Sequence, residues 1–435
     1  MRKTSMFIIS ITLLAVSGCT ESAKLPASAG FGPKPDLSQM NKKIIATINV
    51  AKAVGWPENT TPKVADGNSV TAFAINLEHP RWLYELPNGD VLVAETNHKE
   101  KSDSFSVKAW IAGKLMANGG AAVPSANKIM LLRDTNGDGV ADEYHVFLKN
   151  LNSPFGMSLI GDTFYVANAD AVIKFPYKSG ETEITAAPTK VIDLPAGRNH
   201  HWTKNILASP DGNKLYVSVG SNSNIADHGL DEEKDRAAIW EVDLATGTHK
   251  IFASGLRNPN GLVWEPNSGA LWTVVNERDE LGSDLVPDYM TSVSAGGFYG
   301  WPYSYYGQHV DDRVQPQNPE LVAKAIVPDY ALGAHTASLG LTPAKGNALS
   351  PQFANGMFIG QHGSWNRKPY GGYKVIFVPF ADGKPNGEPI DVLTGFINNK
   401  AEAQGRPVGV IVNKKGALLV ADDVGNTIWT VRATQ

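Results

Sequence analysis

One pattern of apolar and polar residues recurs six times along the chain. Each copy has a strand in which apolar and polar residues alternate, a turn with glycine, and a second strand rich in β-branched and aromatic residues. Alternation on both sides of a glycine turn is typical of a β-hairpin. The copies are LYELPNGDVLVAE (83–95), MSLIGDTFYVANADAVIKF (157–175), ILASPDGNKLYVSVG (206–220), GLVWEPNSGALWTVVNE (261–277), FANGMFIGQHG (353–363) and GVIVNKKGALLVADDVGNTIWTV (409–431), with turn glycines Gly89, Gly161, Gly212, Gly269, Gly356 and Gly416.

The repetition of these hairpins, with almost no helical periodicity between them, predicts the architecture. A small sheet cannot bury both of its faces alone, and packing against neighbours around a ring solves that problem. We predict an all-β fold, a six-bladed β-propeller of four-stranded antiparallel sheets. The uneven spacing implies long insertions at 95–130 and 276–350, which we expect on one face. Segment 43–54 is expected to supply an outer strand that closes the ring.

The N-terminus has the features of a targeting segment. Arg2 and Lys3 precede an apolar run from Met6 to Val16, which is too short for a membrane-spanning helix. The run ends in LAVSGC, which resembles a bacterial lipoprotein signal whose cysteine, here Cys19, is lipidated. An ordinary cleaved signal peptide with an incidental cysteine is the alternative. We expect a periplasmic protein that contacts the membrane through its lipid anchor only, at the outer membrane because no aspartate follows the cysteine.

Three segments follow from these patterns. Residues 1–18 are predicted to be the lipoprotein signal peptide, residues 19–40 a flexible tether, and residues 41–435 the propeller. Cys19 is the only cysteine, so we expect no disulfide in the mature fold. The formal net charge is −4 and Lys and Arg form no run, so nothing favours a nucleic-acid partner.

One loop has the spacing of a calcium site. Asp134, Asn136, Asp138 and Asp142 stand at positions 1, 3, 5 and 9 of the sequence DTNGDGVADE, with a glycine at position 6. Alternating oxygen ligands of this kind surround a hard cation. His145 stands where a twelve-residue calcium hand has glutamate. The loop is therefore a candidate for a structural calcium ion, and a solvated hairpin turn is the alternative.

Polar residues gather just before several hairpins, where neighbouring blades face the central channel. Histidine is the usual general base near neutral pH, and arginine beside asparagine suits a planar ligand that carries carbonyls or charge. Each residue taken alone is more often an ordinary surface or turn residue. The positions are His200–His201, Arg257–Asn258, His335–Thr336, His362 to Arg367, and Arg406.

Two further stretches lie in the second insertion. The loop NERDELGSD (276–284) is dense in carboxylates and could bind a cation or be solvated. The sequence GGFYGWPYSYYG (296–307) is rich in aromatic residues and is either a platform for a sugar or flat cofactor, or part of the core.

Taken together, these residues resemble the soluble quinoprotein sugar dehydrogenases, in particular the sorbosone-dehydrogenase-like branch. The resemblance covers the chain from about residue 65 onward, and its most specific parts are LRNPNGL, NERDELGSDLVPDY, GGFYGWPYSYYG, GAHTASLGL and GQHGSWNR. It implies a six-bladed propeller that binds pyrroloquinoline quinone (PQQ) with calcium. It also implies oxidation of an aldose or a related aldehyde, with an electron acceptor that the sequence does not reveal.

The resemblance also implies roles for single residues. His201 corresponds to the catalytic base, and Arg257 and Asn258 to the pair that contacts the quinone carbonyls. The backbone carbonyls of Arg278 and Asp279 correspond to ligands of the cofactor-site calcium. The basic residues that contact the cofactor carboxylates correspond to Arg406 and to Arg367 or Lys368, and Thr336 corresponds to a cofactor-contacting threonine.

Two departures from the family pattern stand out. Glucose-oxidising members orient the histidine with an aspartate, whereas this chain has Gly220, Ser221 and Asn222 there, so Asp227 or a neutral partner is expected instead. The calcium loop has Arg-Asp in place of Gly-Pro. A calcium-dependent lactonase-type hydrolase and a non-catalytic propeller that binds a carbohydrate or protein are the competing hypotheses.

Overall fold

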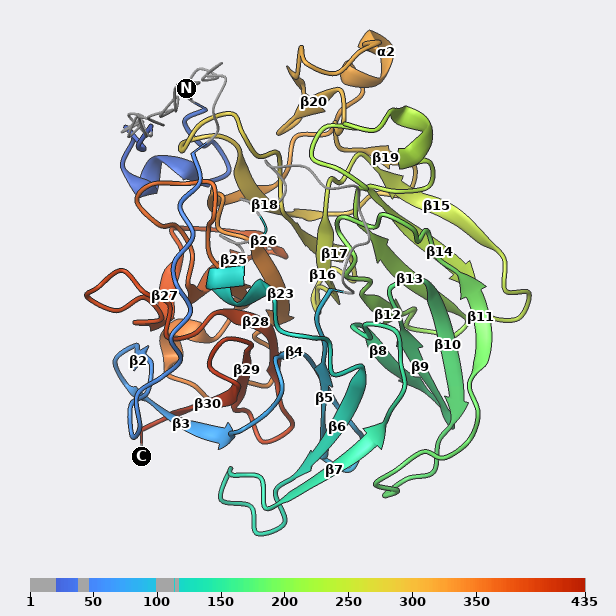
Figure 1. Ribbon diagram of the computed structural model, residues 1–435, viewed down its shortest axis with the longest axis vertical. Helices are drawn as coiled ribbons and strands as arrows, with labels where there is room; N and C mark the ends of the chain where they lie inside the picture. The colour runs from blue at the N-terminus through green and yellow to red at the C-terminus, as the bar shows by residue number, and fades with distance from the viewer. Residues whose placement is uncertain (1–20, 38–46, 99–112, 114–116, 435) are drawn as a thin grey trace, which may run out of the picture.

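The computed structural model describes residues 21–37, 47–98, 113 and 117–434. Within these residues six antiparallel sheets surround a central axis, and Figure 1 looks along that axis. The predicted six-bladed β-propeller is confirmed, with almost no helix. The signal peptide, Cys19 and residues 38–40 of the predicted tether lie outside the described residues.

Each blade begins with an inner strand and proceeds outward. The blades are β4 (Pro80–Glu85), β5 (Val91–Glu95), β6 (Lys128–Arg133) and β7 (Glu143–Leu148); β8 (Met157–Ile160), β9 (Thr163–Ala167), β10 (Ala171–Pro176) and β11 (Thr189–Asp193); β12 (Ile206–Ala208), β13 (Lys214–Val219), β14 (Ala238–Asp243) and β15 (His249–Ser254); β16 (Pro259–Trp264), β17 (Leu271–Val275), β18 (Pro287–Ser292) and β22 (Tyr330–Ala334); β23 (Ser338–Pro343), β24 (Gly356–Gln361), β25 (Lys374–Ala381) and β27 (Ile390–Thr394); and β28 (Pro407–Val412), β29 (Leu418–Asp422), β30 (Thr427–Ala433) and β3 (Asn68–Ala74).

The sixth blade joins the two ends of the described chain. Its outer strand β3 precedes the first blade in sequence and pairs antiparallel with β30, from Asn68 opposite Ala433 to Ala74 opposite Ile428. The ring is therefore closed by an early strand, as expected, but that strand is residues 68–74; residues 43–46 of the predicted segment lie outside the described residues. Residues 47–54 form only an isolated bridge, between Ala53 and Ala403. The alternating sequence NSVTAFA has the period of a half-buried strand, and KIIATINVAKAV does not keep it.

One of the six predicted turn glycines is placed differently. Five of them lie in the turn between the first and second strand of a blade, at the predicted hairpins. Gly356 instead begins β24, and its partner strand β23 lies upstream of residues 344–355. A Cβ at Gly356 would come within 2.2 Å of the Val378 carbonyl oxygen, so the glycine serves close strand packing and not a turn.

Short strands extend three of the sheets at their outer edge. β19 (Gly297–Phe298) joins the third blade, β1 (Phe31–Gly32) the fourth and β2 (Lys63–Val64) the fifth. Residues 21–37, which belong to the predicted tether, contact the propeller: the backbone N–H of Lys24 donates to Asp284 at 2.6 Å, and that of Ser283 to Glu21 at 2.9 Å. This part of the predicted tether therefore packs against the fourth blade.

The core lies between the blades. Phe147 and Phe164, with ring centroids 5.5 Å apart, fill the space between the first and second blades, and Phe353, Phe358 and Phe377 fill the fifth. Full burial of a side chain of this size contributes roughly 1.5–3 kcal/mol. The described helices are all short, and none has the length and apolar character needed to cross a bilayer.

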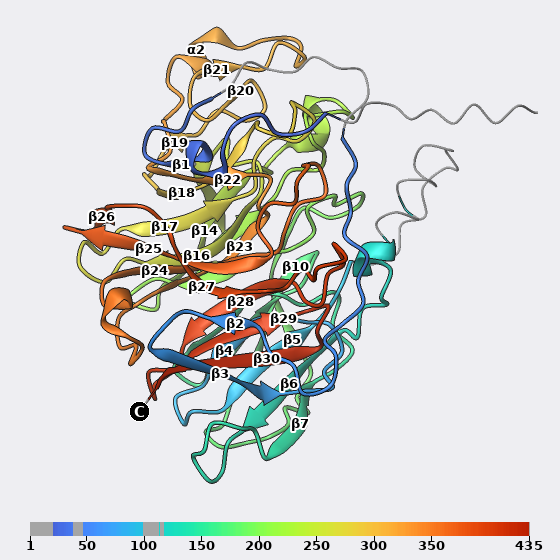
Figure 2. The same ribbon diagram turned by 90° about the vertical axis from the view of Figure 1, so that its left-hand side faces the viewer.

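The N-terminal segment lies along one face of the ring, and the insertion after β18 lies at its outer rim (Figure 1 and Figure 2). Figure 2 shows the N-terminal segment running along this face before it reaches β2 and β3. The Asn49 N–H donates to the Trp365 carbonyl at 2.8 Å, and the Trp56 indole donates to Asp422 at 2.7 Å. The insertion at 293–329 holds β20 (Ser304–Tyr305), β21 (His309–Val310) and α2 (Pro319–Val322).

Candidate functional site

The predicted site residues come from different blades but lie at the same end of them. His201 precedes β12, Asn258 precedes β16, Thr336 precedes β23 and Arg406 precedes β28. In an antiparallel pair the start of the first strand lies beside the end of the second. The residues that follow the second strands, such as Asn276 after β17 and Asp423 after β29, therefore lie at the same end. The blade-by-blade recurrence in the sequence indicates this common placement correctly.

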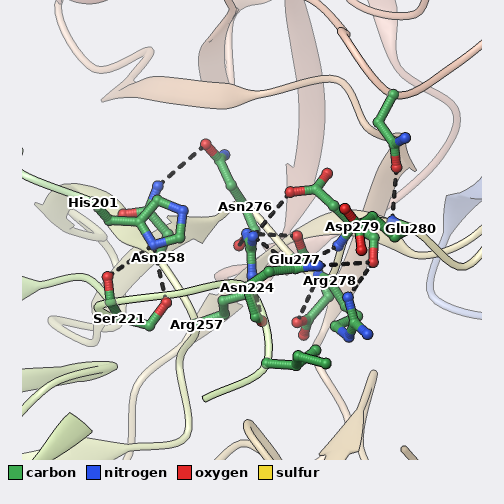
Figure 3. A network of polar contacts seen from close by, with 12 residues as sticks. His201, Ser221, Asn224, Arg257, Asn258, Asn276, Glu277, Arg278, Asp279 and Glu280 are labelled. Carbon is green, nitrogen blue, oxygen red and sulfur yellow. Dashed lines mark hydrogen bonds and ion pairs between the residues drawn. The ribbon is translucent and has the colours of Figure 1, made fainter. Parts of the chain in front are cut away.

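His201 is held so that one of its ring nitrogens is protonated. Nδ1 lies 3.0 Å from the Ser221 carbonyl oxygen and 2.9 Å from the Ser221 hydroxyl (Figure 3). The hydroxyl donates its own proton to the Ser223 carbonyl at 2.7 Å, so it accepts from the ring. Because a carbonyl oxygen can only accept, Nδ1 carries the proton. Nε2 is then the unprotonated nitrogen, which is the state that a general base needs.

The electrostatic surroundings keep His201 neutral. Burial, followed by the charge of Arg257, holds the pKa of His201 well below its usual range. The partner expected for its ring, Asp227, lies elsewhere: its carboxylate accepts the N–H groups of Asn224 and Ile225 at 3.1 and 3.3 Å. The neutral partner that the sequence left open is Ser221.

Lys204 also holds the His201 loop in place, a role that we did not predict from the sequence. The side chain is fully buried, and Nζ donates to the carbonyls of His201 and Trp202 at 3.2 and 3.1 Å and to Asn199 Oδ1 at 3.0 Å. Burial and the charge of Arg236 lower the pKa of Lys204. Three acceptor-only oxygens nevertheless require three N–H donors, which only the ammonium form supplies. A lysine three residues after a catalytic candidate, just before an apolar strand, was the available signal.

Gly220 makes room between His201 and Asn258. A Cβ at this position would lie 2.5 Å from Asn258 Oδ1 and 2.5 Å from the His201 Cβ. The two side chains thus approach each other across the backbone that follows β13. The glycine is required here by close contact, since its backbone conformation is open to any residue.

Arg257 uses all its donors within the protein. Nη1 donates to the carbonyls of Asn276 and Glu277 at 3.2 and 2.7 Å, and Nη2 to Asn224 Oδ1 at 3.0 Å and Asp279 Oδ2 at 2.8 Å. Nε donates to the Asn224 carbonyl at 3.3 Å. A guanidinium has five N–H groups, and all five have acceptors. Arg257 therefore has no N–H group left for the expected contact with quinone carbonyls. It instead holds residues 276–279 in place (Figure 3).

Asn258 has the spare polar atom that Arg257 lacks. Its Nδ2 donates weakly to Asn276 Oδ1 at 3.5 Å, and its Oδ1 is buried without a hydrogen-bond partner. A buried amide oxygen of this kind costs free energy unless something satisfies it. It lies beside Gly220 and hence next to His201 (Figure 3).

The residues expected to hold a cofactor-site calcium are engaged with cations. The Asp279 carboxylate contacts Arg257 at 2.8 Å and His335 Nδ1 at 3.3 Å, and its carbonyl accepts from Arg278 Nη1 and Asn224 Nδ2. The Arg278 side chain turns to Asp311 in the insertion at 2.6 Å. Among the residues described, no three His, Cys, Asp or Glu side chains gather as metal ligands. The side chains around 276–284 thus do not present a calcium ligand set.

His335 balances the charge of Asp279. Its Nε2 donates to the Gly282 carbonyl at 2.8 Å, and its Nδ1 faces the carboxylate, so both nitrogens need a proton. Burial lowers the pKa of His335, but the bond to Asp279 outweighs it and raises the pKa. Burial also raises the pKa of Asp279, yet Arg257 and His335 bring it down to about 2.

Thr336 belongs to a buried acidic network. Its hydroxyl lies 3.1 Å from Asp288 Oδ2 and 3.0 Å from the Ser338 hydroxyl. Burial raises the pKa of Asp288 to about 6 and that of Glu277 to about 8. Thr336 is thus placed on the expected face, but its hydroxyl is occupied by the protein.

A charged cluster that the sequence reading largely missed lies where the first and sixth blades meet. Asp423 accepts from Arg81 at 2.7 Å and from His362 Nε2 at 2.8 Å, and His79 Nε2 is 3.4 Å away. Arg406 donates from Nε to the His362 carbonyl at 2.9 Å and lies over the Tyr373 ring at 5.1 Å. His79 and Arg81 precede and begin the first inner strand, so the rule used for the other blades would have found them.

This cluster has spare capacity for an anion. Nη1 and Nη2 of Arg406 each make one hydrogen bond, to the carbonyls of Gly119 and Gly363, which leaves one N–H on each nitrogen. Nε of Arg81 is buried without a partner. Burial and the charge of Arg406 lower the pKa of His362 to about 3, so its ring is neutral. Two arginines thus face one aspartate, and the cluster has a net positive charge.

Arg367 is directed away from this cluster. Its Nη1 donates to the Ser283 carbonyl and lies 3.4 Å from Asp284 Oδ1. The adjacent Lys368 backbone contacts the same loop and Ala23. Of the two arginines expected to contact cofactor carboxylates, the structure brings only Arg406 to the cluster around His362 and Asp423.

In two further stretches the side chains are engaged within the protein, and calcium in the 134–142 loop stays a prediction. In the 134–142 loop, Asp134 accepts the N–H groups of Gly137 and Gly139 at 2.7 and 3.0 Å and pairs with Lys415 at 2.8 Å. The aromatic residues of 296–307 are mostly core: Tyr299, Trp301, Tyr305 and Tyr306 are all buried. The structure therefore provides no exposed aromatic platform there.

Comparison with known proteins adds the family. The model of the family described as TrAA12-like matches residues 62–290 and 308–434. The chain belongs to this family. The resemblance to soluble PQQ-dependent sugar dehydrogenases is thereby confirmed at the level of the family and fold, while the sorbosone-like branch stays a prediction.

Curated relatives of this TrAA12-like protein include enzymes and an uncharacterised protein. The chain is 22% identical over 402 residues to a PQQ-dependent pyranose dehydrogenase of Coprinopsis cinerea, covering 76% of this chain and 54% of that enzyme. It is 23% identical to a PQQ-dependent sugar dehydrogenase of Hypocrea jecorina, covering 56% of this chain and 57% of that enzyme. The chain thus spans about half the length of these two enzymes. An uncharacterised protein of Borreliella burgdorferi is 28% identical, over 66% of this chain and 77% of its own length.

Solved structures share the fold. The holo PQQ domain of the Coprinopsis cinerea pyranose dehydrogenase aligns with a TM-score of 0.69 at 18% identity, over 88% of this chain and 100% of that one. The PQQ-bound aldose sugar dehydrogenase of Streptomyces coelicolor aligns with a TM-score of 0.56 at 15% identity, over 86% of this chain and 99% of that one. At these identities the likeness concerns the fold alone.

Proposed function

We propose that this protein is a PQQ-dependent dehydrogenase that oxidises a sugar, either an aldose or a sugar-derived aldehyde such as sorbosone. The observation that carries the proposal is the state of His201, a half-buried neutral imidazole whose Nδ1–H is fixed by Ser221. The family membership and the PQQ-dependent relatives support the same chemistry.

The residues at the channel fit a planar, anionic ligand. Arg406 has two N–H groups to spare, Arg81 has a buried Nε without a partner, and Asn258 has a buried Oδ1 without one. We assign Arg406, with Arg81 behind it, to the carboxylates of PQQ, and Asn258 to the quinone edge near His201. A rigid guanidinium fork suits carboxylates, and preorganised donors in a buried site need no rearrangement during reaction.

In the proposed reaction His201 Nε2 takes the proton from the substrate hydroxyl. A hydride then leaves the carbon that bears this hydroxyl, so the substrate loses two electrons and becomes a carbonyl compound. When bound, PQQ supplies the acceptor for that hydride. Removal of the hydroxyl proton by a positioned base contributes typically 10²–10⁴-fold to the rate. Ser221 keeps the protonated nitrogen turned away from the substrate, and Arg257 disfavours the charged imidazolium before reaction.

Calcium at the cofactor site stays a prediction. The oxygens of Asp279 face Arg257, His335 and Arg278, so no reaction step is assigned to a metal ion. A related enzyme of Trichoderma reesei has been solved as a calcium structure, which keeps the prediction open for testing. Calcium in the 134–142 loop stays a prediction on the same footing.

The decisive experiment is reconstitution. Purified protein is mixed with PQQ, with and without calcium, and assayed for reduction of an artificial dye by aldoses and sorbosone and for the visible absorption of bound quinone. We expect a quinone band and sugar-dependent dye reduction. Neither PQQ binding nor turnover across the panel would refute the proposal and leave the lactonase-type hydrolase or the non-catalytic binding propeller.

The cellular setting is also a proposal. We propose a periplasmic protein held at the outer membrane by lipidated Cys19, with a sugar or aldehyde as substrate and an electron acceptor still to be identified. The LAVSGC sequence supports the anchor. Mass spectrometry of the N-terminal peptide and fractionation of a Cys19→Ser variant test it; release of the variant into the soluble periplasm is expected, and an unchanged distribution refutes the anchor.

A further inference from the structure

A buried carboxylate lies behind the loop that holds His201. Glu233 ends a short 3₁₀ helix, η3 (Leu230–Glu233), in the connection between β13 and β14. Its Oε2 accepts the backbone N–H of Asn222 at 2.6 Å, and its Oε1 accepts the Ser223 hydroxyl at 2.6 Å. Glu233 is only 8% exposed, and its carboxylate hydrogen-bonds to Asn222 and Ser223 and not to His201.

The Asn222 N–H belongs to the same peptide group as the Ser221 carbonyl. Glu233 therefore hydrogen-bonds to one end of this peptide while the His201 Nδ1–H bonds to the other end at 3.0 Å. A hydrogen bond from the N–H to a carboxylate shifts electron density through the conjugated amide onto its oxygen, since hydrogen bonds in a chain polarise one another. The Ser221 carbonyl then accepts the imidazole N–H more strongly.

We propose that Glu233 is a positioning residue that acts on His201 through the Ser221–Asn222 peptide, in place of the aspartate that this chain lacks. This proposal rests on the proposed role of His201 as base. The relay would favour the Nδ1–H tautomer and stabilise the imidazolium that forms when Nε2 takes a proton.

A second hydrogen-bonded path runs between the same two residues. The Ser221 hydroxyl, which accepts from His201 Nδ1 at 2.9 Å, donates to the Ser223 carbonyl at 2.7 Å, and the Ser223 hydroxyl donates to Glu233. Both oxygens of the carboxylate are thus used to fix residues 221–223. Charge-assisted bonds of about 2.6 Å are the strong ones in proteins, so this loop is held firmly under the imidazole.

Glu233 is suited to remain an anion in this position. Arg236 lies on the same connection, and Arg257 approaches from the next blade; the charges of both favour the carboxylate. Burial raises the pKa of Glu233, but the two donors and these arginines oppose that effect. Each oxygen faces a donor, which suits a carboxylate and not a carboxylic acid with its own O–H.

The test compares Glu233→Gln with a matched neighbour. Gln keeps the size but loses the charge, and its amide group cannot accept both bonds. Glu232→Gln removes the adjacent, exposed carboxylate, which meets Asn222 only at 3.5 Å through its side chain. Glu233→Asp keeps the charge. Two readouts are taken: the NMR resonance of the His201 Nδ1–H in protein without cofactor, and kcat and KM after reconstitution with PQQ.

We expect Glu233→Gln to shift the Nδ1–H resonance upfield and to lower kcat about 10–100-fold with KM and PQQ affinity unchanged, by analogy with outer partners of metal-bound histidines. Glu233→Asp should restore part of both effects, and Glu232→Gln should match the wild type. An unchanged resonance in Glu233→Gln, or equal effects in Glu232→Gln, overturns the proposal.

Two complications can be told apart from a failure of the proposal: a variant that does not fold, and a wild-type protein without PQQ-dependent turnover. If Glu233→Gln does not fold, Ser223→Ala interrupts only the hydroxyl path, and a smaller shift of the resonance in the same direction is expected; no shift counts against the relay. If the wild-type protein has no PQQ-dependent turnover, the proposed function fails, but the comparison of Nδ1–H resonances still decides whether Glu233 acts on His201.

Discussion

The imidazole of His201 contacts Ser221 through Nδ1, and Nε2 takes no part in this contact. Nδ1 contacts both the carbonyl and the hydroxyl of Ser221, at 3.0 and 2.9 Å. A carboxylate partner would stabilise the charged ring, whereas a carbonyl and hydroxyl fix its tautomer with little charge. The His201 imidazole is therefore oriented mainly by geometry and is kept neutral by burial and Arg257.

The first prediction concerns the base itself. His201→Gln should lower kcat by about 10²–10⁴-fold, because a positioned proton acceptor is lost, while PQQ binding persists. His200→Gln, at the adjacent exposed position, serves as the control and should stay close to the wild type. Steady-state kinetics and titration with PQQ measure the two properties. Substantial turnover in His201→Gln contradicts the assignment.

The second prediction concerns the space at Gly220. Gly220→Ala places a methyl group 2.5 Å from both Asn258 Oδ1 and the His201 Cβ, so these side chains must move. We expect a stability loss of about 1–3 kcal/mol and a large fall in kcat. Gly89→Ala strains a turn with φ of 94° in open space and should reduce stability with little change in kcat. Equal kinetic effects in both variants would show that Gly220 has no special link to the site.

The third prediction separates two arginines that the sequence treats alike. Arg406→Gln should weaken PQQ binding roughly 10-fold or more, because charged hydrogen bonds to a carboxylate contribute about 1.5–3 kcal/mol. Arg367→Gln should leave PQQ affinity within about twofold and lower the melting temperature instead, since its guanidinium binds the 283–284 loop. Equilibrium titration and thermal melts test both. Weaker PQQ binding in Arg367→Gln alone would reverse the assignment.

The fourth prediction concerns acid stability. The folded protein holds the pKa of His362 at about 3, against an ordinary value of 6.5. Between these values the unfolded chain takes up a proton that the folded protein does not, so stability falls as the pH drops below 6.5. His335 acts in the opposite sense: its raised pKa stabilises the fold below 6.5, and that contribution is lost as the pH rises through the folded value.

Urea unfolding at pH 7 and pH 5 measures this effect. The wild type should lose about 2 kcal/mol more between these pH values than His362→Gln does, from a shift of about 1.4 kcal/mol per pKa unit. His79 also has a lowered pKa because of burial, but it is present in both proteins. Identical pH dependence in the two proteins contradicts a neutral, buried His362.

Much of the fold could be predicted because it depends on local periodicity. The hairpins whose second strands begin at Val91, Thr163 and Leu418 could be predicted from alternation and turn glycines alone. The closing strand 68–74 could not be assigned with the same certainty, because its partner β30 lies more than three hundred residues away in sequence and a single short alternating stretch does not reveal its partner. The prediction that Gly356 lies in a turn was wrong because glycine occurs both in turns and where strands pack closely, and the sequence does not distinguish the two.

The site was predictable in placement but not in detail. The position of Asn258, Thr336 and Arg406 before their strands brings them to one face, as the sequence indicates. Which donors are already used depends on contacts between distant loops, such as Arg257 with Asn224 and Arg278 with Asp311. The role proposed for Glu233 could not be predicted from the sequence, because its contact is with a backbone peptide group and has no side-chain motif.

The pairing of β3 with β30, which closes the ring, determines the order in which the parts of the site can assemble. Arg81 follows the closing strand β3, whereas Asp423 and Arg406 belong to the last blade, and the 2.7 Å bond between Arg81 and Asp423 bridges the two. During synthesis, His201 and its loop are available long before β30 emerges, but the contact between Arg81 and Asp423 needs both ends of the ring. Contacts of such sequence separation form slowly. If the proposed function holds, a nascent or partly opened ring therefore contains His201 without the contact between Arg81 and Asp423, and we expect PQQ to bind only to the closed ring.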